Sequence, residues 1–187
     1  MRSSALGPEV VIDEDGLASL PECRFDLHRG RRDLVLFSGD ASPGDDQIQF
    51  SRELLEAAKK AGVREVVSVG ARWTENPLAP DAVPAVKGFA TDAAGVARLK
   101  KCGIEVVTDE PAPFFASVVV GLAGELGMKG YKLSVDHGEP RPHVRSVWKL
   151  AEAVTRLAGV PIPVEELRAA LPTSPPPKEP GQASIYQ

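Results

Sequence analysis

The sequence predicts a soluble α/β protein, built as a sandwich with helices on both faces of a largely parallel sheet. Short apolar runs typical of buried strands alternate along the chain with longer segments whose apolar residues recur at helical spacing. The chain has 187 residues, 43% of them hydrophobic, which suits one domain with a substantial core.

The expected strands are apolar runs that end at glycine or at polar residues. Residues 34–37 read Leu-Val-Leu-Phe, a continuous apolar run, so we expect a strand that is buried on both faces. A second buried strand is expected over residues 65–69. Further strands are expected at residues 10–12, 24–28, 86–91, 104–107 and 132–135.

The expected helices follow the 3.6-residue period. In the first, Ile48, Leu54 and Leu55 are predicted to share the inner face, and a glycine at residue 62 ends the helix. Asp92 is expected to cap the next helix, which closes at Gly103. Other helices are expected at residues 114–126, 144–157 and 164–171.

The composition changes sharply after residue 171. Residues 172–181 are rich in proline, which favours an extended, solvated polyproline II segment over a packed core. We therefore expect an α/β domain over residues 1–171 and a flexible tail over residues 172–187. The tail ends in Ile185, Tyr186 and Gln187, an apolar pair followed by the terminal carboxylate. These groups suit a pocket on a protein partner; from the residues alone, an accidental end to a disordered tail stays the alternative.

Charge and composition argue against several functional classes. The net charge is −4 and the pI is about 5.5, which disfavours a nucleic-acid surface. The longest apolar stretch, residues 114–123, is too short to span a bilayer. Cys23 and Cys102 have no CxxC partners, which favours a reducing compartment, and we expect a cytoplasmic protein.

Two loops contain residues that could carry chemistry. Asp40, Asp45 and Asp46 follow a predicted strand and could hold Mg²⁺, but no phosphate-binding glycine motif accompanies them. His137 and His143 lie among acidic residues after the last strand, at a spacing that matches no standard zinc pattern. We read both loops as structural or solvated, and expect no catalytic residue, metal or cofactor. Neither cysteine has a recognisable base.

Three further residues are candidates for a protein interface. Trp73 follows a strand in a predicted loop, where an exposed aromatic ring could anchor a partner. Gly121 and Gly124 lie in the apolar helix, where small residues allow close packing against the sheet or another subunit.

Several short motifs occur in an order and spacing that resemble one known family. They extend over roughly residues 8–171 and include Glu14-Asp15-Gly16-Leu17, Gly39-Asp40, Gly88-Phe89-Ala90-Thr91-Asp92 and Leu126-Gly127-Met128-Lys129-Gly130. On these motifs the chain resembles the archaeal proteasome assembly chaperones. The resemblance implies a three-layer α/β sandwich similar to the nucleoside phosphorylase fold. Family members usually begin with a glycine-rich strand–helix unit, which we expect this chain to lack.

The resemblance also implies a function. Family members are non-catalytic, act on the proteasome core particle and form small homo-oligomers. Some end in a hydrophobic-Tyr-X (HbYX) motif that enters pockets between the α-subunits; here Ile185, Tyr186 and Gln187 match its three positions. Assembly or activation, the subunit number and a co-assembling paralogue stay open. The alternatives are a phosphorylase-like or ligase-type enzyme acting on a nucleoside or small carboxylate, and a scaffold for another ring-shaped partner.

Overall fold

Four strands precede the first helix, and from α1 onward strands and helices largely alternate, as the sequence predicts. The computed structural model describes residues 10–12, 14–39, 43–44, 46–73, 84–112, 114–137, 144–165 and 169, without the side chains of Trp73 and His137. The helices are α1 (Gln47–Lys60), α2 (Ala93–Lys101), α3 (Phe115–Glu125) and α4 (Val144–Ala158) in this part of the chain. Its strands are β1 (Val11–Ile12), β2 (Ala18–Ser19), β3 (Cys23–His28), β4 (Leu34–Gly39), β5 (Glu65–Trp73), β6 (Val86–Ala90), β7 (Glu105–Val106) and β8 (Lys129–His137).

The central sheet has the strand order β5-β8-β6-β7. Strand β8 pairs in parallel with β5 along its whole length and antiparallel with β6, while β6 pairs in parallel with β7. Most of the pairing is therefore parallel, which confirms the predicted class. Because β8 lies inside the sheet, its Leu133 and Val135 are buried.

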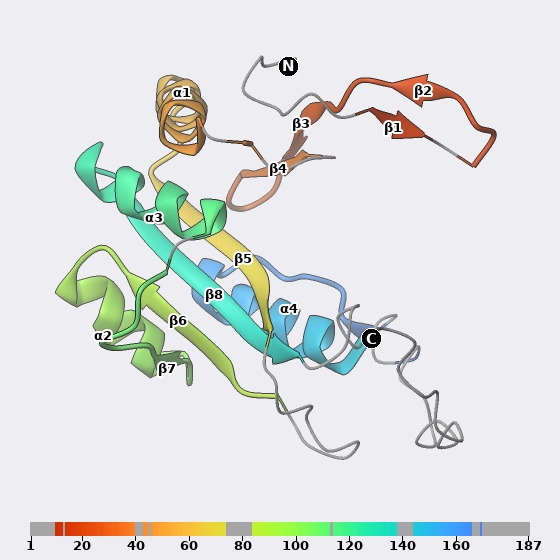
Figure 1. Ribbon diagram of the computed structural model, residues 1–187. Helices are drawn as coiled ribbons and strands as arrows, with labels where there is room; N and C mark the ends of the chain where they lie inside the picture. Colours follow the sequence, from red (N-terminus) through yellow and green to blue (C-terminus); the bar gives the residue numbers. More distant parts are fainter. Residues whose placement is uncertain are drawn as a thin grey trace, which may run out of the picture.

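Helices cover both faces of this sheet and complete the predicted three-layer sandwich (Figure 1). Helices α2 and α4 pack on one face, around Tyr131 and Leu133 of β8. Helix α3 lies over β5 and β8 on the other face. Helix α1 packs against α3, and Leu55 joins Leu122 in a second core cluster.

Local chemistry places the helix ends where the sequence predicts them. The Asp92 carboxylate accepts a hydrogen bond from the backbone N–H of Gly95 at 2.5 Å, and so caps α2. Gly103 follows α2 with φ 71°, and Gly62 follows α1 with φ 91°. Both glycines adopt the left-handed conformation that commonly ends helices.

Glycines also bring α3 close to the sheet. A Cβ at Gly130 of β8 would lie 2.8 Å from the carbonyl oxygen of Val120, and one at Gly124 of α3 would lie 3.0 Å from Cβ of Thr91. Close packing against the sheet is one of the two roles expected for the small residues of this helix.

The expectation that residues 34–37 are buried on both faces is wrong. Among the described residues, β4 pairs with β3 alone in a separate antiparallel hairpin. Leu36 is 53% exposed and Val35 is also exposed. The apolar run forms a strand as predicted, but only Phe37 packs against the helices, through Phe50.

Two other side chains are more exposed than predicted. Ile48 is 62% exposed, because the inner face of α1 is formed by Phe50, Ser51, Leu54 and Leu55. Ser51 can occupy that buried position because its hydroxyl donates to the carbonyl of Gln47 at 2.6 Å. Val69 is 49% exposed, since β5 is an edge strand of the sheet.

Candidate functional site

Apolar side chains remain exposed along the N-terminal strands. They are Val10, directly before β1, and Ile12, Leu17, Leu20, Phe25, Leu27, Val35 and Leu36, within β1–β4 and their connections. Scattered exposed apolar residues are normal, but extended apolar surfaces are typical of protein-binding sites. This set, which we call the N-terminal apolar surface, spans two separate two-stranded sheets and both faces of the β3–β4 hairpin, and it is a candidate for contact with a partner.

An aromatic row holds the β3–β4 hairpin to the helical layer. The ring centroids of Phe25 and Phe37 are 5.2 Å apart, those of Phe37 and Phe50 are 6.3 Å apart, and those of Phe50 and Phe115 are 5.7 Å apart. Tilted rings at such distances attract one another. The neighbouring cross-strand pair, Leu27 and Val35, stays exposed beside the row.

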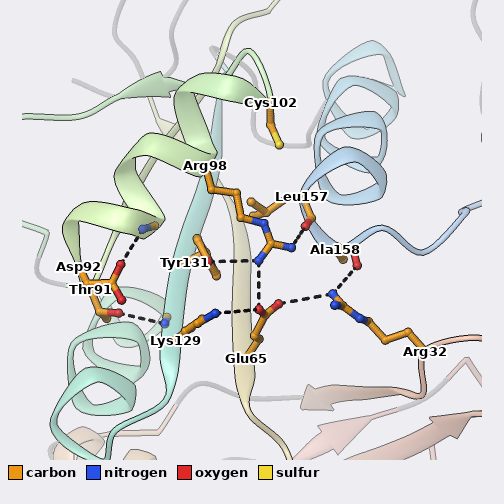
Figure 2. A network of polar contacts seen from close by, with 12 residues as sticks. Arg32, Glu65, Thr91, Asp92, Arg98, Cys102, Lys129, Tyr131, Leu157 and Ala158 are labelled. Carbon is orange, nitrogen blue, oxygen red and sulfur yellow. Dashed lines mark hydrogen bonds and ion pairs between the residues drawn. The ribbon is translucent and has the colours of Figure 1, made fainter.

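A polar network fastens the hairpin, the sheet and two helices together (Figure 2). Arg98 of α2 lies 3.0 Å from Oε1 of Glu65 and 3.3 Å from the Tyr131 hydroxyl, and also donates to the carbonyl of Leu157. Arg32, from the β3–β4 turn, donates to the carbonyl of Ala158 at 2.8 Å and lies 3.5 Å from Glu65. The network ties elements distant in sequence, and its charged groups are paired.

Charged groups also meet at the carboxyl ends of β5 and β8. Arg72 and Asp136 are partners in register, with Nε 2.7 Å from Oδ1. Glu110 lies 2.8 Å from Arg72, and Lys87 lies 3.1 Å from Asp136. Burial alone would raise the Asp136 pKa, but hydrogen bonds from Arg72 and Lys87 outweigh it and hold the pKa below its usual range. Asp136 is therefore ionised and paired at neutral pH, which suits a structural role.

Lys132 lies in the interior of the same sheet. It is 8% exposed, and burial lowers its pKa from 10.5 to about 8. The sequence alone does not single out this residue, because a lysine inside the pattern Tyr-Lys-Leu-Ser-Val fits a strand with one polar, solvated face. One sequence feature could have indicated its burial: the apolar helix that follows β7 must cover one face of β8.

The predicted interface residues occupy different environments. Ile185, Tyr186 and Gln187 lie outside the described residues, and only the backbone of Trp73 is described, at the end of β5. Gly121 is exposed on α3, with nothing within 4 Å of an added Cβ, whereas Gly124 faces Thr91.

The two loops with candidate chemistry are described only in part. Asp46 precedes α1 as its N-cap residue but makes no side-chain cap bond. Asp40, Asp45, His143 and the side chain of His137 lie outside the described residues. Cys23 and Cys102 are not joined by a disulfide. In the described part of the chain, no group of three or more His, Cys, Asp or Glu side chains could hold a metal ion.

The described helices include none that is long and apolar enough to cross a membrane.

Comparisons with known proteins give one family and one fold. The model of the PAC2 family matches residues 1–171. Among solved structures, Pyrococcus furiosus PbaB, an archaeal proteasome activator, aligns with TM-score 0.74 and 20% identity over 89% of this chain and 74% of its own. Pyrococcus furiosus PbaA, an archaeal homolog of proteasome-assembly chaperone, aligns with TM-score 0.70 and 20% identity over 90% and 71%. A proteasome-assembly chaperone homologue from Mycobacterium tuberculosis aligns with TM-score 0.73 and 23% identity over 89% and 74%. No curated protein matches.

Proposed function

Since the chain belongs to the PAC2 family, we propose that it is a non-catalytic protein that binds the proteasome core particle, as an assembly chaperone, an activator or both. The observation that carries this proposal is the family match over residues 1–171. The similar folds of a proteasome activator and of an assembly-chaperone homolog support it. A cytoplasmic location would give the protein access to this partner.

We assign docking to the C-terminal residues. Residues 172–187, fully extended, reach roughly 50 Å at about 3.3 Å per residue. That length lets the domain rest on a ring while the Ile185 side chain and the Tyr186 ring enter a pocket between α-subunits. The terminal carboxylate of Gln187 would pair there with a cation. Proline-rich sequences favour an extended polyproline II conformation, so the composition of residues 172–181 would reduce the entropy lost on binding.

The domain would contribute the N-terminal apolar surface and self-association. Burying exposed apolar area gives about 25 cal/mol per Å², so covering these strands would favour assembly. Several tails on one small homo-oligomer would bind a ring with avidity, even where each tail binds weakly. Light scattering after size exclusion tests this: we expect an oligomer at micromolar concentration, and Leu27→Ser with Leu36→Ser should shift it toward monomer. A wild-type monomer would contradict self-association.

The experiment on docking compares four chains for binding to the proteasome core particle and for stimulated peptide hydrolysis. They are the wild type, Tyr186→Ala, a chain ending at Ser184, and a chain with one glycine added after Gln187. We expect each change to weaken binding, Tyr186→Ala by about 2 kcal/mol or more per tail, as for an interface hot spot. The glycine extension keeps every side chain and moves only the carboxylate. Equal binding by all four chains would exclude docking through the tail.

The enzyme alternative makes a different prediction in the same assays. A phosphorylase-like or ligase-type enzyme would need neither Tyr186 nor the chain end for its activity, and would convert a nucleoside or a small carboxylate into product. At the carboxyl ends of the strands, the described carboxylates Asp136 and Glu110 are held in ion pairs. This arrangement favours the binding protein.

A further inference from the structure

Lys132 is a buried cation with no protein partner among the described residues. It is 8% exposed, and neither a hydrogen bond nor an ion pair reaches its ammonium group from the described part of the chain. Lysine is almost never buried to this extent without a counter-charge, since the ammonium group loses its hydration. Its neighbours in register are Ser68 on β5 and Phe89 on β6, neither of which carries a charge.

The ammonium group lies over β5, in space that a glycine leaves open. A Cβ at Gly70 would lie 2.8 Å from Nζ of Lys132, so any larger residue there would displace the lysine head. Gly70 pairs with Ser134 in the second half of the parallel β5–β8 ladder. The amine therefore points toward the carboxyl ends of these strands, where open α/β sheets bind ligands.

The first turn of α3 lies over this part of the sheet. A Cβ at Gly130 would contact the carbonyl oxygen of Val120, and α3 runs back along β8 because the short connection after it leads directly into that strand. From Val120 to Phe115 the helix extends about 7.5 Å, and from Gly130 to Lys132 the strand extends about 6.6 Å. The start of α3 and Lys132 therefore lie at about the same distance along the β8 strand direction. Phe114, the N-cap residue of α3, makes no side-chain cap bond, and the Ser117 amide donates to the Phe114 carbonyl at 2.7 Å. The first two amides of this 11-residue helix, at residues 115 and 116, therefore keep donors for an anion.

The neighbouring charges do not neutralise Lys132. On the same face, Arg72 and Lys87 are paired with Asp136 and Glu110, and Glu105, the register partner of Lys87, adds a further, exposed carboxylate. The only charged residue of α3 is Glu125 at its far end, which lies 3.5 Å from Arg52 of α1. Among the described residues, none of these carboxylates forms an ion pair with Lys132, so no close opposite charge offsets its burial there.

We propose that Lys132 and the uncapped first turn of α3 bind a small oxyanion, a carboxylate or a phosphate, on the sheet face beside Gly70. The ammonium group supplies the charge, the amides at the start of α3 supply oriented donors, and Gly70 supplies the space. This site is independent of docking by the tail, and nothing in the proteasome-binding proposal requires it.

The test is a pH titration of the full chain, monitored by NMR of the lysine side chains. The Lys132 signal is assigned by its absence in Lys132→Met. Three solutions of equal ionic strength are compared: sodium chloride alone, inorganic phosphate and acetate. In chloride the Lys132 pKa should be about 8. Phosphate or acetate should raise it by about one unit or more, as a close opposite charge does. A response to phosphate alone identifies a phosphate site, and a response to acetate alone identifies a carboxylate site.

A second measurement uses thermal unfolding in the same three solutions. The binding anion should raise the melting temperature of the wild type and of Lys101→Met, a control at an exposed lysine, but not that of Lys132→Met. Three results would overturn the proposal: a Lys132 pKa near 10.5 in chloride, which would reveal a counter-charge within the chain; no response to either anion; or an equal thermal response in Lys132→Met.

Discussion

Replacing Lys132 with methionine should stabilise the protein at neutral pH and remove part of its pH dependence. The lysine pKa is 10.5 in an unfolded chain and about 8 in the fold. A difference of about 2.5 units, at 1.36 kcal/mol per unit, corresponds to about 3 kcal/mol of unfolding free energy. Below pH 8 the ammonium is charged in both states, so the fold bears the whole desolvation cost. Between pH 8 and 10.5 the unfolded chain binds one proton more than the folded chain, and stability rises with pH.

Methionine has a similar length and no charge, so Lys132→Met should be more stable than the wild type by about 3 kcal/mol at pH 7. The difference should shrink as the pH rises through 8 and should approach zero near 10.5. Urea unfolding at pH 7, 8, 9 and 10 measures it, since groups that titrate equally in both proteins cancel in the comparison. A constant difference across this range, or a variant less stable than the wild type at pH 7, would refute the reasoning.

Two further predictions concern the packing of α3 and the carboxyl ends of the strands. Gly130→Ala would place a Cβ 2.8 Å from a backbone oxygen of α3 and should cost about 1–3 kcal/mol, whereas Gly121→Ala, with nothing within 4 Å, should stabilise the folded subunit by up to about 1 kcal/mol. Equal unfolding midpoints for the two variants would contradict this packing. Asp136→Asn should cost about 2 kcal/mol at pH 7. Because the Asp136 pKa is lowered in the fold, its contribution is present at neutral pH and lost as the pH falls through that pKa, so wild type and variant should converge in acid; parallel acid profiles would count against the ion pair.

Local signals were sufficient to predict most of the fold. The two ends of α2 were predictable from Asp92 and Gly103, because helix capping and a left-handed glycine depend only on neighbouring backbone groups. The parallel class followed from the alternation of strands and helices, which restricts the possible connections. The prediction that residues 34–37 form a strand buried on both faces was wrong, because a short apolar run does not indicate whether its strand joins the main sheet or a separate hairpin.

Of the candidate sites, one was found from the sequence and the other only from the structure. The docking role of Ile185, Tyr186 and Gln187 rests on their resemblance to the family's hydrophobic-Tyr-X motif, and it stays a prediction that the proteasome assay tests. The burial of Lys132 could not be predicted from local sequence, because the alternation of polar and apolar residues in this strand assigns it to a polar face and does not show that a helix covers that face. Only the tertiary arrangement of α3 over β8 turns an ordinary lysine into a buried charge.

The tail and the Lys132 site would impose different requirements on the same domain. Tail docking needs a stable platform, and the unpaired lysine reduces the stability of that platform by about 3 kcal/mol, a substantial fraction of the 5–15 kcal/mol typical of small proteins. A leucine or methionine at position 132 would avoid this cost, since burying an apolar side chain removes no charge from water. Such a local conflict between residue and environment is most often found where a ligand binds. An oxyanion that pairs with Lys132 would return much of the lost stability, and the platform for the tail would then be most stable when this site is occupied.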